Sequence, residues 1–196
     1  MSLENKNVQN LTSKGNPLLK KRLVKESEPV ITSRSLDEYQ DIFGVDFKKM
    51  KGELVLDIGS GRGSFWKEAT DLGLKVISLN PAFSKLNSSS YYSLKQIAHP
   101  EGDVSARAQE MPFADNSFNF EFALYSVPTY LPQVAKEYEN TINEIYRTLK
   151  PGGKAYIYPV ALKQFNDFLK QQFIDKKVLF SYSFDEDRFI LVLTKK

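Results

Sequence analysis

The chain has 196 residues, a length that fits one domain with a sizeable core. It contains no cysteine, which excludes disulfides and thiolate metal sites, and its single histidine argues against a transition-metal centre. No apolar run approaches the roughly 18 to 20 residues that span a bilayer. The first residues also lack the apolar stretch of a signal peptide. We therefore expect a soluble, cytoplasmic protein with no metal site and no membrane span.

Positive charge is concentrated at the N-terminus. The net charge is +3, and residues 1–34 carry seven Lys/Arg against three Glu, whereas the remainder carries twenty basic and twenty-one acidic residues. A nucleic-acid-binding face needs Lys and Arg clustered on the folded body, so nucleic acid is not an expected partner. Residues 1–33 are predicted to form a polar, basic, flexible segment. Residues 34–196 are predicted to form the folded domain.

The folded domain is predicted to begin with a helix. Ser35 has the character of an N-cap, and Glu38 follows three residues later, as in a capping box. Tyr39 and Phe43 lie four residues apart and therefore share one face of this helix. Packing against a sheet is one role for that face.

A glycine-rich segment follows at residues 53–65. Its apolar run, 54–56, shows no alternation, which is typical of a strand buried on both faces of a parallel sheet. The run ends at Asp57, and three glycines then alternate with other residues, at Gly59, Gly61 and Gly63. Glycine allows a sharp turn and a close approach of a ligand to the backbone. The helix that opens next directs free N–H groups at the loop.

Two classes of nucleotide ligand fit such a loop. A dinucleotide fingerprint, G-x-G-x-x-G, would place its third glycine at Ser64. The spacing here is instead G-x-G-x-G, with Asp57 two positions before the first glycine. This pattern resembles the first motif of class I S-adenosylmethionine-dependent methyltransferases, whose loop wraps the amino-acid end of the cofactor.

The next elements alternate between helix and strand. Residues 66–72 suit a helix that ends at Gly73, and residues 75–79 suit a strand that closes at Asn80-Pro81. This alternation implies a parallel sheet with right-handed crossovers. Residues 84–98 fit either a weakly started helix or a mobile lid near the site.

Two later segments also resemble the small-molecule methyltransferase group that includes quinone-biosynthesis enzymes. Residues 108–120 resemble its "LPF-pDnsFD" segment, and residues 147–153 its "R-v-L-k-P-G-G" segment. We predict a strand over 118–124, a helix over 134–149 and a strand over 154–158, with Lys150–Lys154 ending the helix.

The C-terminal part completes the predicted fold. Residues 162–173 show a helical apolar stripe, and residues 178–184 and 189–194 are predicted to form a hairpin. The resemblance, over about 36–194, implies an α/β, Rossmann-like, doubly wound fold. Its mostly parallel sheet would have seven strands, the last of them antiparallel.

The resemblance implies transfer of a methyl group from S-adenosylmethionine to an acceptor by in-line displacement. The near-neutral body favours a small-molecule acceptor. A catalytically inactive methyltransferase-fold protein that acts as a binding or regulatory partner is the alternative, and the oligomeric state stays open. The residues that the resemblance assigns to the cofactor site are Asp57, Gly59, Ser60, Gly61, Gly63, Asn80, Pro81, Arg107, Ala108, Gln109, Leu124 and Tyr125.

Two of these positions depart from the family pattern. Asn80 stands where the family usually has an acidic residue that accepts from the ribose hydroxyls, and Arg107 stands where an Asp commonly lies near the adenine amino group. An amide can still accept one hydrogen bond, whereas a guanidinium has no acceptor.

Substrate contacts are assigned only as candidates, each with ordinary packing as the alternative. His99 is either a general base or an exposed loop residue. The candidate contact residues are Tyr39, Tyr125, Thr129, Tyr130 and Tyr158.

Overall fold

The computed structural model describes residues 34–61, 63–81, 102–127, 129, 135–161, 179–185 and 188–196, with side-chain surroundings omitted for 179–185 and 188. Three predicted features lie outside these residues: the flexible segment 1–33, the helix or lid at 84–98 and the helical stripe at 162–173. These predictions, and the domain boundary at 33/34, stay predictions.

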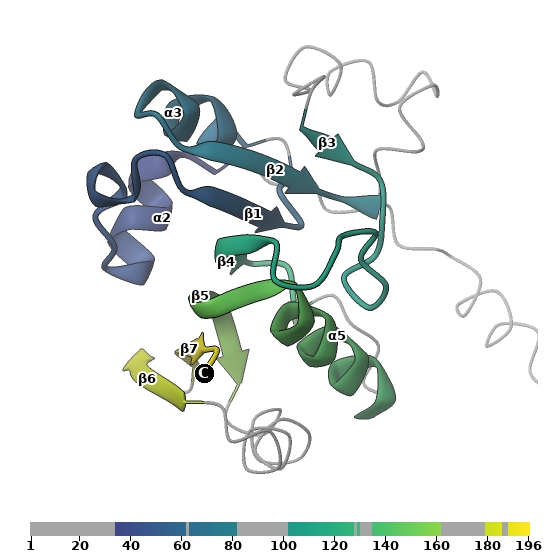
Figure 1. Ribbon diagram of the computed structural model, residues 1–196. Helices are drawn as coiled ribbons and strands as arrows, with labels where there is room; N and C mark the ends of the chain where they lie inside the picture. The colour runs from purple at the N-terminus through teal and green to yellow at the C-terminus, as the bar shows by residue number, and fades with distance from the viewer. Residues whose placement is uncertain are drawn as a thin grey trace, which may run out of the picture. The chain divides into compact units, whose positions relative to one another are not determined.

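The described residues form one seven-stranded sheet (Figure 1). The strand order is β3-β2-β1-β4-β5-β7-β6; the first five strands of this order pair in parallel, and β7 is antiparallel to both β5 and β6. This topology confirms the predicted mostly parallel sheet with an antiparallel last strand. The strands are β1 (Leu54–Ile58), β2 (Lys75–Leu79), β3 (Asp103–Val104), β4 (Phe118–Leu124), β5 (Leu149–Ala161), β6 (Leu179–Asp185) and β7 (Arg188–Thr194).

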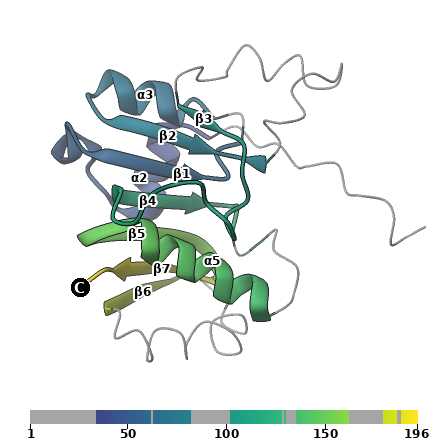
Figure 2. The ribbon, with the colours of Figure 1, turned by 45° about the vertical axis from the view of Figure 1, so that its right-hand side comes forward.

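Helices cover both faces of the sheet, as a doubly wound fold requires. Residues of α2 and α3 pack on one face and residues of α5 on the other (Figure 2). In the part of the chain that the structure describes, no helix has the length and apolar character needed to cross a bilayer. The helices are α2 (Leu36–Phe43), the 3-10 helix η1 (Phe47–Met50), α3 (Phe65–Asp71) and α5 (Ala135–Thr148).

Capping residues set the ends of α2 and α3. The Ser35 side chain accepts from the Glu38 N–H, which confirms the predicted N-cap. Leu36 donates its N–H to the Glu68 carboxylate of α3 at 2.6 Å, and this bond ties the start of α2 to α3. Gly73, with φ of +92°, follows the end of α3 as predicted.

Strand β5 is longer than the predicted range 154–158. It begins at Leu149, directly after α5, and runs to Ala161. Leu149 pairs with Phe118, whereas Lys154 pairs with Phe120. The extra residues of β5 between these two pairs, 150–153, form a bulge that contains the Pro-Gly-Gly sequence. The predicted start of this strand at residue 154 was therefore wrong. The proline and glycines of residues 151–153 indicated where the helix ends, but they did not indicate that the chain already pairs with β4 at Leu149.

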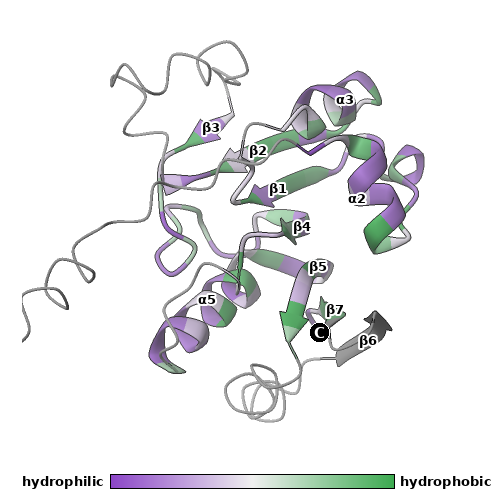
Figure 3. Ribbon diagram, turned by 180° about the vertical axis from the view of Figure 1, so that it is seen from behind, coloured by the Kyte–Doolittle hydropathy of each residue, from purple (hydrophilic) through white to green (hydrophobic). Residues whose placement is uncertain are grey.

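Figure 3 shows hydrophobic and hydrophilic residues alternating along α2, α3 and α5, as expected for helices that pack on a sheet with one side. The two faces of the sheet differ in the side chains that they bury. The face under α5 is mainly aliphatic, whereas the face under α2 and α3 is aromatic. Phe122 has no exposed surface and lies at the centre of the aromatic face. Its ring is stacked on Tyr156 at 5.1 Å and lies 5.3 Å from the ring of Phe47. Such ring contacts add to the free energy gained by burial.

We expect Phe122→Ala to lower the free energy of unfolding by about 3–5 kcal/mol, because the fully buried ring would leave a cavity. Phe120, on the same strand and the same face but only half-buried, is the matched control. Phe120→Ala should cost less than half as much. Urea unfolding followed by circular dichroism measures both values, and equal losses would contradict the assignment of Phe122 to the centre of this core.

Candidate functional site

The carboxyl ends of the central parallel strands meet at one edge of the sheet. β1 lies between β2 and β4, and the chain crosses from one side of β1 to the other at this point. In open α/β sheets, ligands bind in the crevice outside such a switch point. The segments that leave these strand ends contain Gly59–Gly63 after β1, Asn80-Pro81 after β2 and Tyr125-Ser126 after β4.

Backbone hydrogen bonds hold the glycine loop against the neighbouring strands. The Leu79 carbonyl accepts from the N–H groups of Gly59 at 2.7 Å and Ser60 at 3.4 Å. On the other side, the Ser126 hydroxyl donates to the Ile58 carbonyl at 2.6 Å. Gly59 has a φ of +74°, and a Cβ there would collide with the Ser126 side chain. Only glycine therefore fits at position 59.

The loop is equally tight at Gly63. A Cβ at this position would lie 2.7 Å from the Arg34 carbonyl oxygen. That oxygen accepts the Phe65 N–H, at the start of α3, at 3.2 Å. Residue 34 therefore lies directly on the glycine loop. Gly61, between the two tight positions, is half-buried.

Asp57 is a buried acid at the end of β1. Its side chain is 1% exposed and accepts the Tyr39 hydroxyl at 2.7 Å. Burial raises the pKa of Asp57 to about 6, although the Arg34 charge and the hydrogen bond from Tyr39 both oppose this shift. Burial, followed by the proximity of Asp57, raises the pKa of Tyr39 well above its usual value. Tyr39 is thus a neutral donor near pH 7.

Tyr39 is accordingly a packing residue rather than a surface for substrate. Its ring has no exposed surface and stacks on Phe65 at 4.1 Å. Of the two roles open for Tyr39 in the sequence, the structure supports packing.

Sequence analysis missed Arg34. The guanidinium is 3% exposed, and its Nη2 donates to the Gly59 carbonyl at 3.0 Å. Three buried atoms beside the loop have no hydrogen-bond partner among the described residues: Arg34 Nε, Arg34 Nη1 and the Ser60 hydroxyl. Buried polar atoms are rarely left unpaired, so these atoms fit a polar ligand in the loop. In the sequence, a single Arg before an N-cap carries no pattern that would place its side chain at the glycine loop.

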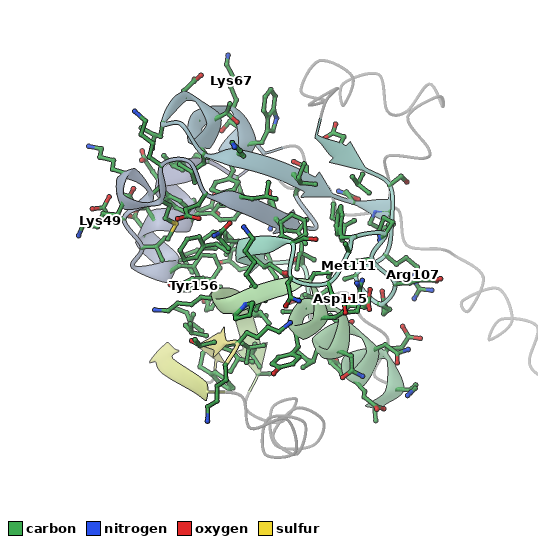
Figure 4. All side chains as sticks on the ribbon, viewed as in Figure 1. Lys49, Lys67, Arg107, Met111, Asp115 and Tyr156 are labelled. Carbon is green, nitrogen blue, oxygen red and sulfur yellow. The ribbon has the colours of Figure 1, made fainter. Side chains whose placement is uncertain are left out.

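The segment after β3 is directed towards α5. Arg107 and Gln109 both donate to the Glu137 carboxylate, at 3.2 and 2.7 Å. Arg107 is exposed (Figure 4). Ala108 is buried in the aliphatic core together with Leu79. The Arg107 side chain is therefore occupied by an acidic partner on α5.

Arg147 of α5 fixes the chain that follows. Its guanidinium donates to the carbonyls of Met111 at 3.0 Å and Phe113 at 2.6 Å, and to Asp115 at 2.9 Å. Figure 4 places Met111 and Asp115 beside α5. In this chain, Arg147 of the "R-v-L-k-P-G-G" segment thus ties α5 to the "LPF" segment.

The remaining predicted residues differ in their access to a ligand. The Leu124 side chain has no exposed surface, so only its backbone can face a ligand. Tyr125 is half-buried, with a φ of +49°; its N–H donates to the Tyr158 carbonyl at 2.7 Å, and the two rings lie edge to face at 5.4 Å. Asn80 is half-buried, and Pro81 and Thr129 are exposed. His99 and Tyr130 lie outside the described residues.

Comparison with known proteins agrees with this geometry. A family model described as "Methyltransferase domain" matches residues 56–157. The chain is 33% identical over 117 residues to sterol 4-C-methyltransferase of Caenorhabditis elegans, covering 59% of this chain and 33% of that protein. It is 29% identical over 121 residues to demethylmenaquinone methyltransferase of Renibacterium salmoninarum, covering 60% and 45%. The chain thus spans less than half the length of these relatives.

A solved structure shows the same fold. The TehB-like S-adenosylmethionine-dependent methyltransferase of Corynebacterium glutamicum is 18% identical and superposes with a TM-score of 0.58, over 92% of this chain and 100% of that one. The family match begins within β1 and ends within β5, and so includes the glycine loop and the switch point. The chain belongs to the methyltransferase-domain family.

Proposed function

We propose that this protein transfers a methyl group from S-adenosylmethionine to a small molecule. The observation that carries the proposal is the glycine loop at the switch point. Gly59 and Gly63 have no room for a side chain there, and buried polar atoms beside them have no hydrogen-bond partner among the described residues. The names of the relatives, which act on a sterol and on demethylmenaquinone, support an apolar or aromatic small-molecule acceptor.

The cofactor supplies an activated methyl group on a sulfonium sulfur, and transfer of that methyl to the acceptor leaves S-adenosylhomocysteine. The protein must hold the acceptor in line with the methyl group, and positioning alone supplies much of the rate. In this proposal the loop backbone from Gly59 to Gly63 lies against the methionine end. Asp57, in its ionised form, faces the ammonium group, and Asn80 at the end of β2 faces the ribose.

Tyr125 and Tyr158 are the proposed contacts for the acceptor or the sulfonium. Tyr125 directly follows β4, Tyr158 lies within the neighbouring β5, and the half-buried Tyr125 precedes Ser126, which contacts the loop. Such faces attract cations and pack on flat apolar molecules. We further propose a cytoplasmic location, which the lack of cysteine supports, and no role for nucleic acid as substrate.

Calorimetric titration tests the cofactor. We expect S-adenosylmethionine and S-adenosylhomocysteine to bind with one-to-one stoichiometry and NAD not to bind. Gly59→Ala should weaken S-adenosylhomocysteine binding by more than about tenfold, because the new methyl group displaces Ser126 and strains the backbone.

The matched control for this variant is Gly152→Ala. Gly152 also has a positive φ, +77°, but no atom lies within 4 Å of a Cβ placed there. The substitution therefore reproduces the backbone strain away from the loop, and it should leave cofactor affinity unchanged. If neither cofactor form binds the wild-type protein at millimolar concentration, the proposal fails and the non-catalytic alternative takes its place.

The affinity for S-adenosylhomocysteine should depend on pH through Asp57. Because its pKa is about 6 in the free protein, Asp57 is ionised above this pH and binds the ligand ammonium; below it, a proton must first leave. Affinity should thus be constant above about pH 6.5 and fall by up to about tenfold per pH unit below 6. Asp57→Asn should bind more weakly, with no such slope between pH 5 and 7. A flat wild-type profile would show that Asp57 does not face the ammonium.

A further inference from the structure

Arg34 keeps a positive charge inside the protein. A guanidinium does not lose its proton under ordinary conditions, and burial of an unpaired charge is costly. The side chain is 3% exposed, and one of its three nitrogens, Nη2, donates to the Gly59 carbonyl. The other two nitrogens have no hydrogen-bond partner among the described residues.

The surrounding groups do not neutralise this charge directly. Arg34 lowers the pKa values of both Asp57 and Tyr39, so its guanidinium lies near both side chains. Asp57, however, accepts the Tyr39 hydroxyl, and no described carboxylate oxygen forms an ion pair with Arg34 within 4.0 Å. The buried cation therefore has spare donors and no directly bound anion in this part of the chain.

The position of Arg34 relative to the loop is fixed at two points. Its side chain binds the carbonyl of Gly59, the first loop glycine, and its own carbonyl lies against Gly63 and accepts from Phe65. The guanidinium is thus held at the first turn of the loop. The next residue is Ser60, whose buried hydroxyl has no hydrogen-bond partner within the described ranges. A preorganised, buried guanidinium is well suited to bind a carboxylate.

We propose that Arg34 binds the α-carboxylate of the methionine end of the cofactor. This inference rests on the proposed function and assigns one subsite of it. An α-amino acid carries one anion and one cation on the same carbon atom. Arg34 and Asp57, which lie near each other beside the loop, supply the complementary pair of charges.

The test compares two ligands that differ only in the carboxylate. We would titrate S-adenosylhomocysteine and its decarboxylated analogue, which keeps the adenosine, the thioether and the amine, into the wild-type protein and variants. Loss of a charge-assisted hydrogen-bonded contact should weaken wild-type binding of the analogue by about 10- to 100-fold. Arg34→Ala should bind the two ligands with affinities within about threefold of each other, because the recognition of the carboxylate has gone.

Two further variants separate charge, folding and site. Arg34→Gln removes the charge but keeps a polar side chain that can donate to the Gly59 carbonyl, and it takes the place of Arg34→Ala if that variant does not fold. Lys67→Ala removes an exposed positive charge from nearby α3 and should keep the wild-type ratio of affinities. Figure 4 shows Lys67 projecting outward.

The possible outcomes distinguish this inference from the proposed function. If the wild-type protein binds both ligands equally well, or if a folded Arg34 variant keeps the wild-type ratio, Arg34 does not bind the carboxylate, and the proposed function stands. If the wild-type protein binds neither ligand, the proposed function fails as well.

Discussion

The arrangement of the site depends on the burial of Asp57. A carboxyl group at the end of β1 is removed from water, and the Tyr39 hydroxyl at 2.7 Å and the nearby charge of Arg34 oppose the resulting cost. Both partners come from residues 34–43, which contain α2 and the residues directly before it. These contacts hold α2 against the sheet, with Arg34 on the glycine loop. One buried polar group thus couples α2, β1 and the glycine loop.

The same coupling makes the loop intolerant of change. Gly59 is confined by Ser126 from the end of β4, and Gly63 by the backbone of Arg34. The described residues of the loop are thereby held between β2, the end of β4 and the residue before α2. Preorganisation of this kind lowers the entropic cost of binding, which suits a site that must hold two reactants in line.

The sequence predicted the parts of the fold that depend on local residue patterns. The apolar runs of β1, β2 and β4, the N-cap of α2 and the C-terminal hairpin follow from periodicity and turn residues. β3, with only two residues, has no pattern to detect. Arg34 and Glu137 could not be predicted either, because their importance arises from contacts between residues far apart in the chain. Motif spacing thus located the loop, but the hydrogen-bond partners of Arg107 and Asp57 could be identified only from the folded structure.

In the proposed site, the two departures from the family pattern would face the adenosine end of the cofactor, whereas the buried polar groups would face the methionine end. The guanidinium of Arg107 has no acceptor for an adenine amino group, and it is paired with Glu137. At the other end, Arg34 and Ser60 keep buried donors without partners in the described protein. Such groups lower stability when nothing binds them, and a purely structural loop would gain from their replacement by apolar side chains. Their presence favours a protein that still binds a charged, amino-acid-like ligand over a methyltransferase fold retained only as scaffold.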